Sequence, residues 1–422
     1  MKFYNSILLN ISVILTLLLT YSVAAAEHNH QAMAQQKLNN KCKTSDINCA
    51  KTVTSAFAPN GDLWRLWSHK KNMYFQISVD LGKTFSLAKR VLIPAEKISS
   101  RNENRPKIAF DNFNGVYLSW AMPREKKYTA DVRFSYSSDY GQTFSMPITV
   151  NNDKLLAGHS FNEINVSGDG DISIVWLDGR LSAELKKQGK STNGSALYLA
   201  KGNIRKSGAV IETSSFSNQQ LANNTCVCCR IAMDTNKQGE LAIFWRHIYG
   251  DNIREFALLT LPDKNVHQQN ETIPTPYQVS YDHWKINGCP HQGGGISIDE
   301  ADEYHLVWFN QGDNGKGIFY ASSTDQGKTL TKPLAIGKKS AQASHPHISQ
   351  QGNNVDIVWT QYNGIEHQLW HQRSTDNGKS FSDSQMLTTS TTGADRPFII
   401  KNGKVTLVSW QRPKFGHWVK VL

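Results

Sequence analysis

Ser78-Val-Asp80-Leu-Gly82-Lys-Thr84-Phe85 is the first of four copies of one eight-residue phrase in this 422-residue chain. The other copies are Ser137-Ser-Asp139-Tyr-Gly141-Gln-Thr143-Phe144, Ser323-Thr-Asp325-Gln-Gly327-Lys-Thr329-Leu330 and Ser374-Thr-Asp376-Asn-Gly378-Lys-Ser380-Phe381. Ser and Asp side chains bond back to the amides of a tight turn, and Gly accepts a positive φ at little cost. Each copy therefore predicts a hairpin in which the Asp is structural and the closing Phe or Leu packs beneath the turn.

A longer unit repeats around these phrases: a short strand, a Gly or Asn turn, and an alternating strand that ends in Trp. The tryptophans, spaced 51 to 69 residues apart, are Trp67, Trp120, Trp176, Trp245, Trp308, Trp359 and Trp410. Repeated short strands without a helical period are typical of propeller blades. We expect an all-β propeller of four-stranded blades over residues 53–422, with seven units and a six-bladed ring as the alternative. The last unit lacks an outer strand, which residues 42–52 are candidates to supply.

The N-terminus predicts export. Lys2 precedes an apolar run over residues 7–19, and small residues at 22–26 suit signal cleavage. We therefore expect a Sec-type signal peptide over residues 1–26 and a secreted or periplasmic mature protein without a membrane span. Residues 27–52 are polar and predict a flexible leader, which a Cys42–Cys49 disulfide would close into a short loop.

The formal net charge of +11 is spread along the chain, without long basic runs and without a nucleic-acid-binding motif. This pattern favours a basic surface and a small-molecule, glycan or metal ligand over a nucleic acid. The sequence leaves the oligomeric state open.

The repeated phrase resembles the Asp-box of the bacterial neuraminidase repeat, so most of residues 53–422 are similar to sialidase-like propellers. The resemblance implies an exo-α-sialidase-like glycoside hydrolase with an arginine clamp for an anionic sugar and a paired Tyr and Glu. The candidates for these roles are Arg105, Arg230, Arg396, Glu163 and Tyr362. The Phe/Tyr-Arg-Ile-Pro context of the first family arginine is absent, so the sequence leaves open whether the chain is an enzyme.

Two further phrases, Thr225-Cys226-Val-Cys228-Cys229-Arg230 and Asn287-Gly-Cys289-Pro-His291, resemble those of uncharacterised secreted sialidase-like proteins. Both precede the first strand of a unit, and in a propeller equivalent positions converge at one mouth of the axial channel. Thiolates and imidazoles gathered there suit zinc or copper. The candidate metal ligands are Cys226, Cys228, Cys229, Cys289, His291, His247, His345 and His347.

Disulfides are the competing interpretation, because six cysteines in an exported chain can form three bridges. A mixed site, with one bridge and the remaining thiols and imidazoles as ligands, is a third alternative. The sequence therefore predicts a propeller that binds a ligand or a transition metal through a Cys/His/Arg cluster at its mouth, with a sialidase-like hydrolase as the alternative.

Overall fold

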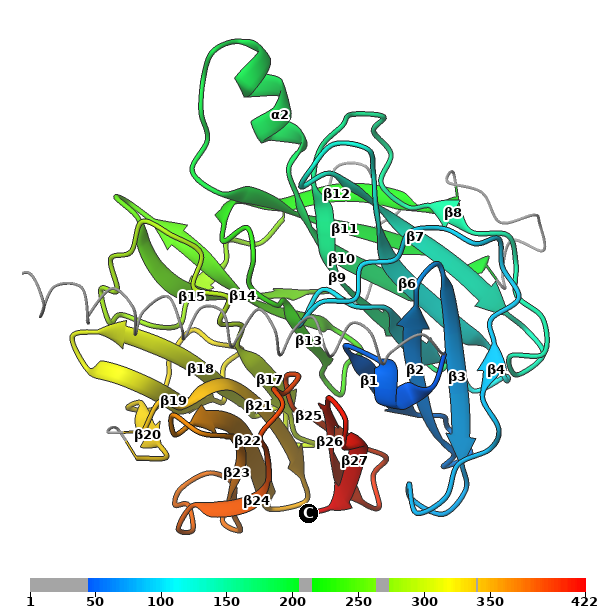
Figure 1. Ribbon diagram of the computed structural model, residues 1–422. Coiled ribbons are helices and arrows are strands. Elements are labelled where there is room, and N and C mark those ends of the chain that lie inside the picture. Colours follow the sequence, from blue (N-terminus) through cyan, green and yellow to red (C-terminus); the bar gives the residue numbers. More distant parts are fainter. Residues whose placement is uncertain (1–44, 205–214, 263–272, 339–340) are drawn as a thin grey trace, which may run out of the picture. The chain divides into compact units, whose positions relative to one another are not determined.

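Seven blades of antiparallel strands follow one another in the computed structural model, which describes residues 45–204, 215–262, 273–338 and 341–422 (Figure 1). The first strand of each blade lies beside the first strand of the next, and the last blade returns to the first. The sequence therefore predicted the propeller and its seven units correctly. The signal peptide, most of the leader and Cys42 lie outside the described residues.

Over the residues that the structure describes, six blades have four strands and the seventh has three. In chain order they are blade 1, β1 (Val53–Phe57), β2 (Leu63–His69), β3 (Asn72–Ser78) and β4 (Lys89–Arg90); blade 2, β5 (Lys107–Phe110), β6 (Val116–Pro123), β7 (Ala130–Ser137) and β8 (Ile148–Thr149); blade 3, β9 (His159–Val166), β10 (Ile172–Asp178), β11 (Ser195–Gly202) and β12 (Ser217–Thr225); blade 4, β13 (Ala232–Thr235), β14 (Leu241–Tyr249), β15 (Ile253–Leu261) and β16 (Tyr277–Gln278); blade 5, β17 (Gly295–Ile298), β18 (Tyr304–Gly312), β19 (Gly315–Ser323) and β20 (Leu334–Ile336); blade 6, β21 (Ser344–Gln351), β22 (Asn354–Tyr362), β23 (His367–Ser374) and β24 (Gln385–Ser390); and blade 7, β25 (Phe398–Lys401), β26 (Thr406–Arg412) and β27 (Gly416–Val421).

The core lies between the blades, and the periodic tryptophans form its centre. All seven lie on second strands and are at most 2% exposed. Strands β6 and β14 are buried on both faces over most of their length because each blade is covered by its two neighbours. The periodic Trp residues are therefore packing groups.

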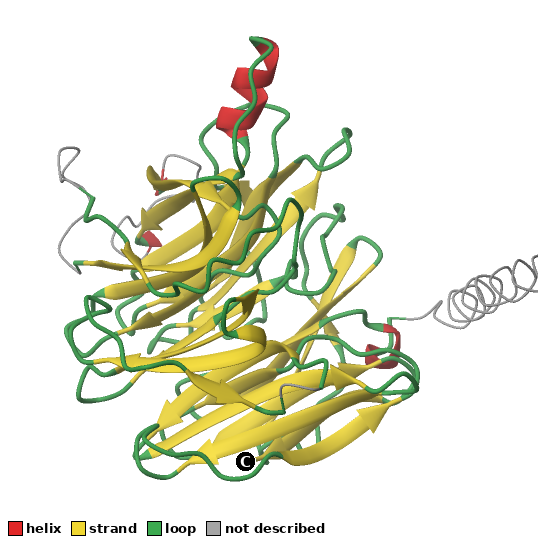
Figure 2. Cartoon of the chain, turned by 90° about the vertical axis from the view of Figure 1, so that its left-hand side faces the viewer, coloured by secondary structure: helices red, strands yellow, loops and turns green. Residues whose placement is uncertain are grey.

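Two short helices lie outside the blades in the described part of the chain. The 3-10 helix η1 (Ile47–Cys49) packs on β27, and Gln411 Nε2 on the neighbouring β26 donates to the carbonyls of Ile47 and Ala50. The expected outer strand from residues 42–52 is not formed by residues 45–50, because this segment turns back on itself instead of extending along β27. Helix α2 (Arg180–Lys187) projects from the loop after β10 (Figure 2). No helix among the described residues is long and apolar enough to cross a membrane.

The four repeated phrases follow the third strands of blades 1, 2, 5 and 6, and they share one hydrogen-bond pattern. In the first, Ser78 Oγ accepts from the Gly82 amide at 2.8 Å and Asp80 Oδ1 accepts from the Thr84 amide at 2.8 Å. The residue before each Gly also has a positive φ: Leu81 at 60°, Tyr140 at 56°, Gln326 at 61° and Asn377 at 56°. That conformation directs side chains onto the preceding blade. Tyr140 Oη lies 2.7 Å from Asp62, and Gln326 Nε2 lies 2.8 Å from Glu240. Each of these phrases thus joins two blades as well as closing a hairpin.

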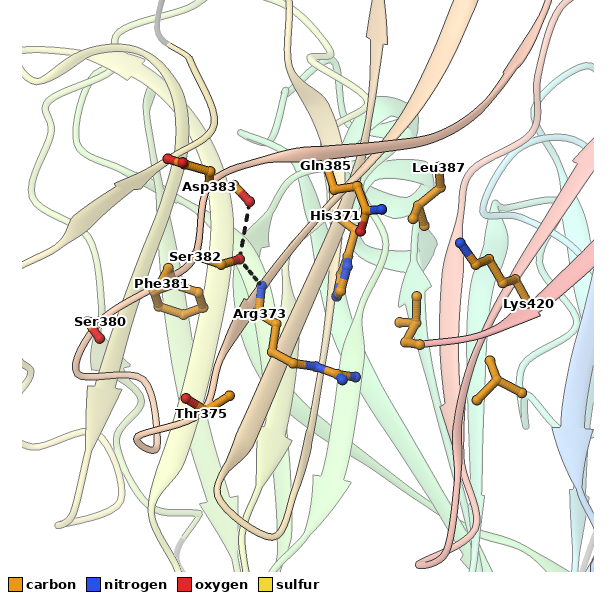
Figure 3. Close-up of a pocket in the computed structure, with 12 residues that line it drawn as sticks. His371, Arg373, Thr375, Ser380, Phe381, Ser382, Asp383, Gln385, Leu387 and Lys420 are labelled. Atoms are coloured by element: carbon orange, nitrogen blue, oxygen red, sulfur yellow. Dashed lines mark hydrogen bonds between the residues drawn. The ribbon is translucent and has the colours of Figure 1, made fainter.

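Beside β27, which is the outermost strand of blade 7 among the described residues, lies a groove of about 780 Å³ (Figure 3). The groove lies near the repeated phrase of blade 6, at the end of the ring opposite the starts of the inner strands. His371 Nε2 and Arg373 Nε, which line it, both contact Asp356 Oδ1 at 2.7 Å. These two basic groups are therefore occupied within the protein.

Candidate functional site

The starts of the seven inner strands converge at one mouth of the channel, as the sequence predicted for a propeller. Contacts there join residues far apart in the chain: Arg105 before β5 binds Asp395 before β25, and Arg230 before β13 contacts Glu103 before β5. The Phe398 ring at the start of β25 lies within 6 Å of the cationic groups of Arg105, Lys107 and Arg230. The mouth is therefore a crowded, charged layer of side chains.

Two of the three candidate clamp arginines are engaged by the protein. The Arg105 guanidinium, 1% exposed, donates to both Asp395 carboxylate oxygens at 2.6 Å and to the Val53 carbonyl at 3.2 Å. Arg230 donates to the backbone carbonyls of Gly294 and Pro346 and pairs with Glu103 at 3.3 Å. Their bidentate donor faces therefore point at protein groups.

Arg396 differs from the other two. Its side chain is partly buried, and its Nε has no hydrogen-bond partner among the described residues. Burial lowers the pKa of Arg396, while Glu103 and Asp395 favour its charged form. The structure thus brings the three arginines together, and Arg396, unlike Arg105 and Arg230, makes no ion pair among the described residues.

No hydrogen bond joins Glu163 to Tyr362 among the described residues. Glu163 is paired with Lys107 at the axis; burial raises the pKa of Glu163 and lowers that of Lys107. Tyr362, at the outer end of β22, is 43% exposed; its hydroxyl donates to the Gly364 carbonyl at 2.9 Å and its ring faces His367. Each group has its own partners, and these partners lie on different blades.

The cysteines gather where blades 3 and 4 join. Thr225 at the end of β12 pairs with His247 on β14, and the Cys226 amide donates to the Arg246 carbonyl at 2.9 Å. The chain then turns, so that Cys226 Sγ lies 3.2 Å from Cys229 Sγ and 3.8 Å from Cys228 Sγ. All three residues are at most 5% exposed.

Cys289, from the segment before β17, adds a fourth sulfur through a contact with the Cys228 thiol, which lowers the pKa of Cys289. Hydrogen bonds from the Cys228 and Cys229 thiols lower the pKa of Cys226, whereas burial raises that of Cys229. The buried Arg246 guanidinium interacts with Cys229 and Cys226. None of these four cysteines is in a disulfide, so the group can hold one thiolate shared among neighbouring thiols.

The candidate histidines divide between different surroundings. His247 is adjacent to Arg246 on β14, so its side chain points to the other face of the strand; it packs on Tyr249, and burial lowers its pKa to about 4. The His347 ring lies on Phe398, and its Nδ1 accepts from the Ile399 amide at 3.2 Å. Neither imidazole is part of the sulfur group.

His291 and His345 lie on the arginine side of the mouth. Both have positive φ, 52° and 55°, which is strained for a non-glycine residue and is commonest at functional sites. Burial lowers the pKa of His345, with further contributions from Arg396 and His291, and its Nδ1 has no hydrogen-bond partner among the described residues. His345, His291 and Arg396 therefore form a second polar group beside the sulfurs.

Sequence reasoning missed several residues of the mouth: Glu103, Asp395, Phe398, Arg246 and His367. Asp395 directly precedes Arg396-Pro397, and Glu103 lies two residues before Arg105, so charged neighbours of the Arg-Pro pairs were the available signal. Burial lowers the pKa of His367, and the nearby Arg396 lowers it further.

No protein-family model matches the chain, and no curated protein sequence matches it. Solved structures share its fold. A PL25 ulvan lyase, described as representing a new family of polysaccharide lyase, is 10% identical over 88% of this chain and 93% of that chain, with a TM-score of 0.54. Polysaccharide lyase Uly1 is 10% identical over 88% and 89%, with a TM-score of 0.51. The Hadza microbial sialidase Hz136 is 11% identical over 86% and 73%, with a TM-score of 0.48. Similarity at these identities concerns the fold alone.

Proposed function

We propose that this protein is an exported propeller that binds one soft or borderline metal ion, copper or zinc, through Cys226, Cys228, Cys229 and Cys289. The observation that carries the proposal is the approach of three buried sulfurs, whose ligand atoms all lie within 4.8 Å of one another. Four sulfurs around one zinc ion at about 2.3 Å lie about 3.8 Å apart, so small side-chain rotations suffice. A buried thiolate cluster without a partner cation is costly, and a metal ion removes that cost.

The buried Arg246 guanidinium also favours a metal site made of thiolates. Its charge compensates the additional thiolates that form when the metal displaces thiol protons. The propeller would then be a rigid frame that presents ligands from the segments before blade 4 and before blade 5, where Cys229 and Cys289 are 60 residues apart in the sequence. Disulfide formation is the direct competitor, because Cys226 and Cys229 sulfurs at 3.2 Å can close into a bridge after rotation.

The experiment is metal analysis of protein that was purified without a histidine tag, reduced, and loaded with Cu(I), which thiolates bind and carboxylates do not. We expect one ion per chain, loss of binding in Cys229→Ser and Cys228→Ser, and full binding in the Cys42→Ser/Cys49→Ser control. Cobalt substitution should show sulfur-to-metal charge-transfer absorption, which a site made of imidazoles alone would lack. Failure of the reduced wild type to retain metal, together with four oxidised cysteines in the native protein, would refute the proposal.

A second candidate function rests on Arg396. Its unpaired, partly buried Nε beside His345 and His291 suits an anionic group such as a sugar carboxylate or sulfate. Binding of uronic-acid and sialic-acid oligosaccharides by calorimetry tests this function, with Arg396→Met as the variant and exposed Arg101→Met as the control. Release of product from a fluorogenic sialoside would extend the function to hydrolysis. Equal affinity in the wild type and Arg396→Met would exclude Arg396 as the contact.

A further inference from the structure

At the end of the ring opposite the mouth, the turn between the first two strands of blade 5 carries a group of potential metal ligands that the proposed function does not use. Asp299, Glu303 and His305 each place one ligand atom within 4.8 Å of the others. Asp299 and His305 are buried, and Glu303 is partly buried, so the group has one side from which an ion can enter.

The same five-residue turn occurs in blades 2 and 4, and the comparison isolates what is unusual in blade 5. Asp111 Oδ1 accepts two turn amides, at 2.8 and 2.7 Å, and Asp111 Oδ2 accepts from the Tyr117 hydroxyl at 2.7 Å. Asp299 Oδ1 likewise accepts the Ala301 and Glu303 amides at 2.8 Å. The residue in the place of Tyr117 is His305, whose Nε2 stops 3.7 Å from Asp299 Oδ2.

His305 is fully buried, and its Nε2 has no hydrogen-bond partner among the described residues. Its other ring nitrogen, Nδ1, lies 2.7 Å from the Tyr320 hydroxyl, which fixes the ring orientation. A histidine that ligates a metal is oriented in this way, by a hydrogen bond to the nitrogen that does not bind the ion. Burial lowers the pKa of His305, whereas Glu303 and Asp299 favour its protonated form.

The repeated phrase of blade 6 closes the group from outside. Asn377, which holds a φ of 56°, donates through Nδ2 to Asp299 Oδ2 and to Glu303 Oε2, each at 3.0 Å. The two ends of an amide are nearly equal in shape, so rotation of this amide presents its oxygen to the same point. The nearby Lys401 is held by Ser297 and Gln350 and makes no ion pair with either carboxylate among the described residues.

We infer that Asp299, Glu303 and His305, with the amide of Asn377, form a binding site for a hard or borderline divalent cation that joins blade 5 to blade 6. Two carboxylates, an imidazole and an amide oxygen suit Mn²⁺ or Zn²⁺ rather than a thiophilic ion. Donors on one such ion at about 2.2 Å lie at most about 4.4 Å apart, so the observed group needs shifts of a few tenths of an ångström. The cation would balance the charge of the two carboxylates, which make no ion pair with a Lys or Arg side chain among the described residues.

Asp153, His159 and Asp178 form another group of potential metal ligands, but they leave no position open for a cation. Arg180 Nη2 lies 3.1 Å from Asp153 and 2.9 Å from Asp178, and His159 Nε2 lies 2.9 Å from Asp153. A guanidinium already occupies the position that a cation would take there.

Mn²⁺ is the probe that tests the inference, because it binds thiolates weakly and so leaves the cysteine cluster out of the measurement. Chelator-treated full-length mature protein is titrated with MnCl₂, and free Mn²⁺ is followed by electron paramagnetic resonance. We expect one bound ion per chain and a rise in Tm on binding. Electron spin-echo modulation should show coupling to an imidazole nitrogen.

Glu303→Gln and His305→Asn should each weaken Mn²⁺ binding at least tenfold, and His305→Asn should abolish the nitrogen coupling. Glu240→Gln is the matched control, because Glu240 holds the same turn position in blade 4 and contacts the phrase residue Gln326, but Ala242 stands there in place of His305. Glu240→Gln and Cys229→Ser should bind Mn²⁺ as the wild type does, which separates this site from the thiolate site. Absence of a bound ion in folded wild-type protein, or equal loss in Glu240→Gln and Glu303→Gln, would overturn the inference.

Discussion

Removing the Arg105–Asp395 ion pair should destabilise the ring strongly. The pair joins blade 2 to blade 7 across the start of blade 1, where the ring closes without a strand shared between its two ends. Its side chains are 1% and 2% exposed, and both hydrogen bonds measure 2.6 Å. Such a pair leaves a buried, uncompensated charge when one partner is removed.

The magnitude follows from these contacts. Loss of one partner of a buried pair costs about 3–5 kcal/mol. Arg105→Met also removes donors from the Val53 and Asn102 carbonyls, at about 1 kcal/mol each, so we expect roughly 5 kcal/mol for Arg105→Met and roughly 4 kcal/mol for Asp395→Leu. The double variant Arg105→Met/Asp395→Leu buries no charge and should cost less than either single variant.

Urea unfolding followed by tryptophan fluorescence measures these free energies, with Arg101→Met as an exposed control from the same segment that should change stability by less than about 0.5 kcal/mol. The reasoning would be refuted if each single variant lost less than about 1 kcal/mol of unfolding free energy and the double variant lost the sum of the two. That result would mean that the pair does not hold the ring and that Arg105 is available to a ligand.

Two further predictions concern the repeated phrases. Gly141→Ala should destabilise the protein by roughly 3 kcal/mol in thermal unfolding, because φ is 79° and the new Cβ would lie 2.8 Å from Trp64 Cη2. The control Gly352→Ala, at a φ of 61° with open space around the new Cβ, should cost only about 1 kcal/mol. Equal costs for the two variants would contradict the packing argument. The Thr84 hydroxyl and amide lower the pKa of Asp80 to about 2, and the Ser380 hydroxyl does the same for Asp376. Because these folded-state values lie below the unfolded value of about 3.9, the stabilisation is present above about pH 4 and is lost as the pH falls toward about 2. Asp80→Asn/Asp376→Asn should therefore lose less Tm than the wild type over that interval, and parallel pH profiles would contradict this assignment.

The sequence was sufficient for the scaffold because the scaffold is local chemistry repeated. A tight turn requires Gly82 and its equivalents, and a strand that is covered on both faces requires apolar residues such as those around Trp120. The same residue types recur in successive units. For the same reason, the sequence indicated that its last unit lacks an outer strand. The positive φ of Tyr140 and Asn377 could not be predicted from the sequence, because the residue type alone does not show that these side chains contact the neighbouring blade.

The candidate site was only partly accessible from sequence. Register within the repeat placed Arg105, Arg230, Arg396 and the cysteines at one mouth, since equivalent strands start at one end of a propeller. Which of these groups have partners depends on contacts between residues hundreds of positions apart, such as Arg105 with Asp395, and a repeat pattern carries no information about them. The tertiary structure alone decided that Arg105 and Arg230 are engaged by the protein, that Cys226, Cys228 and Cys229 meet as thiols, and that His305 stops short of Asp299. The repeated phrases determine the ring through interactions within single turns, whereas the chemistry at its two ends depends on side chains that only the closed ring brings together.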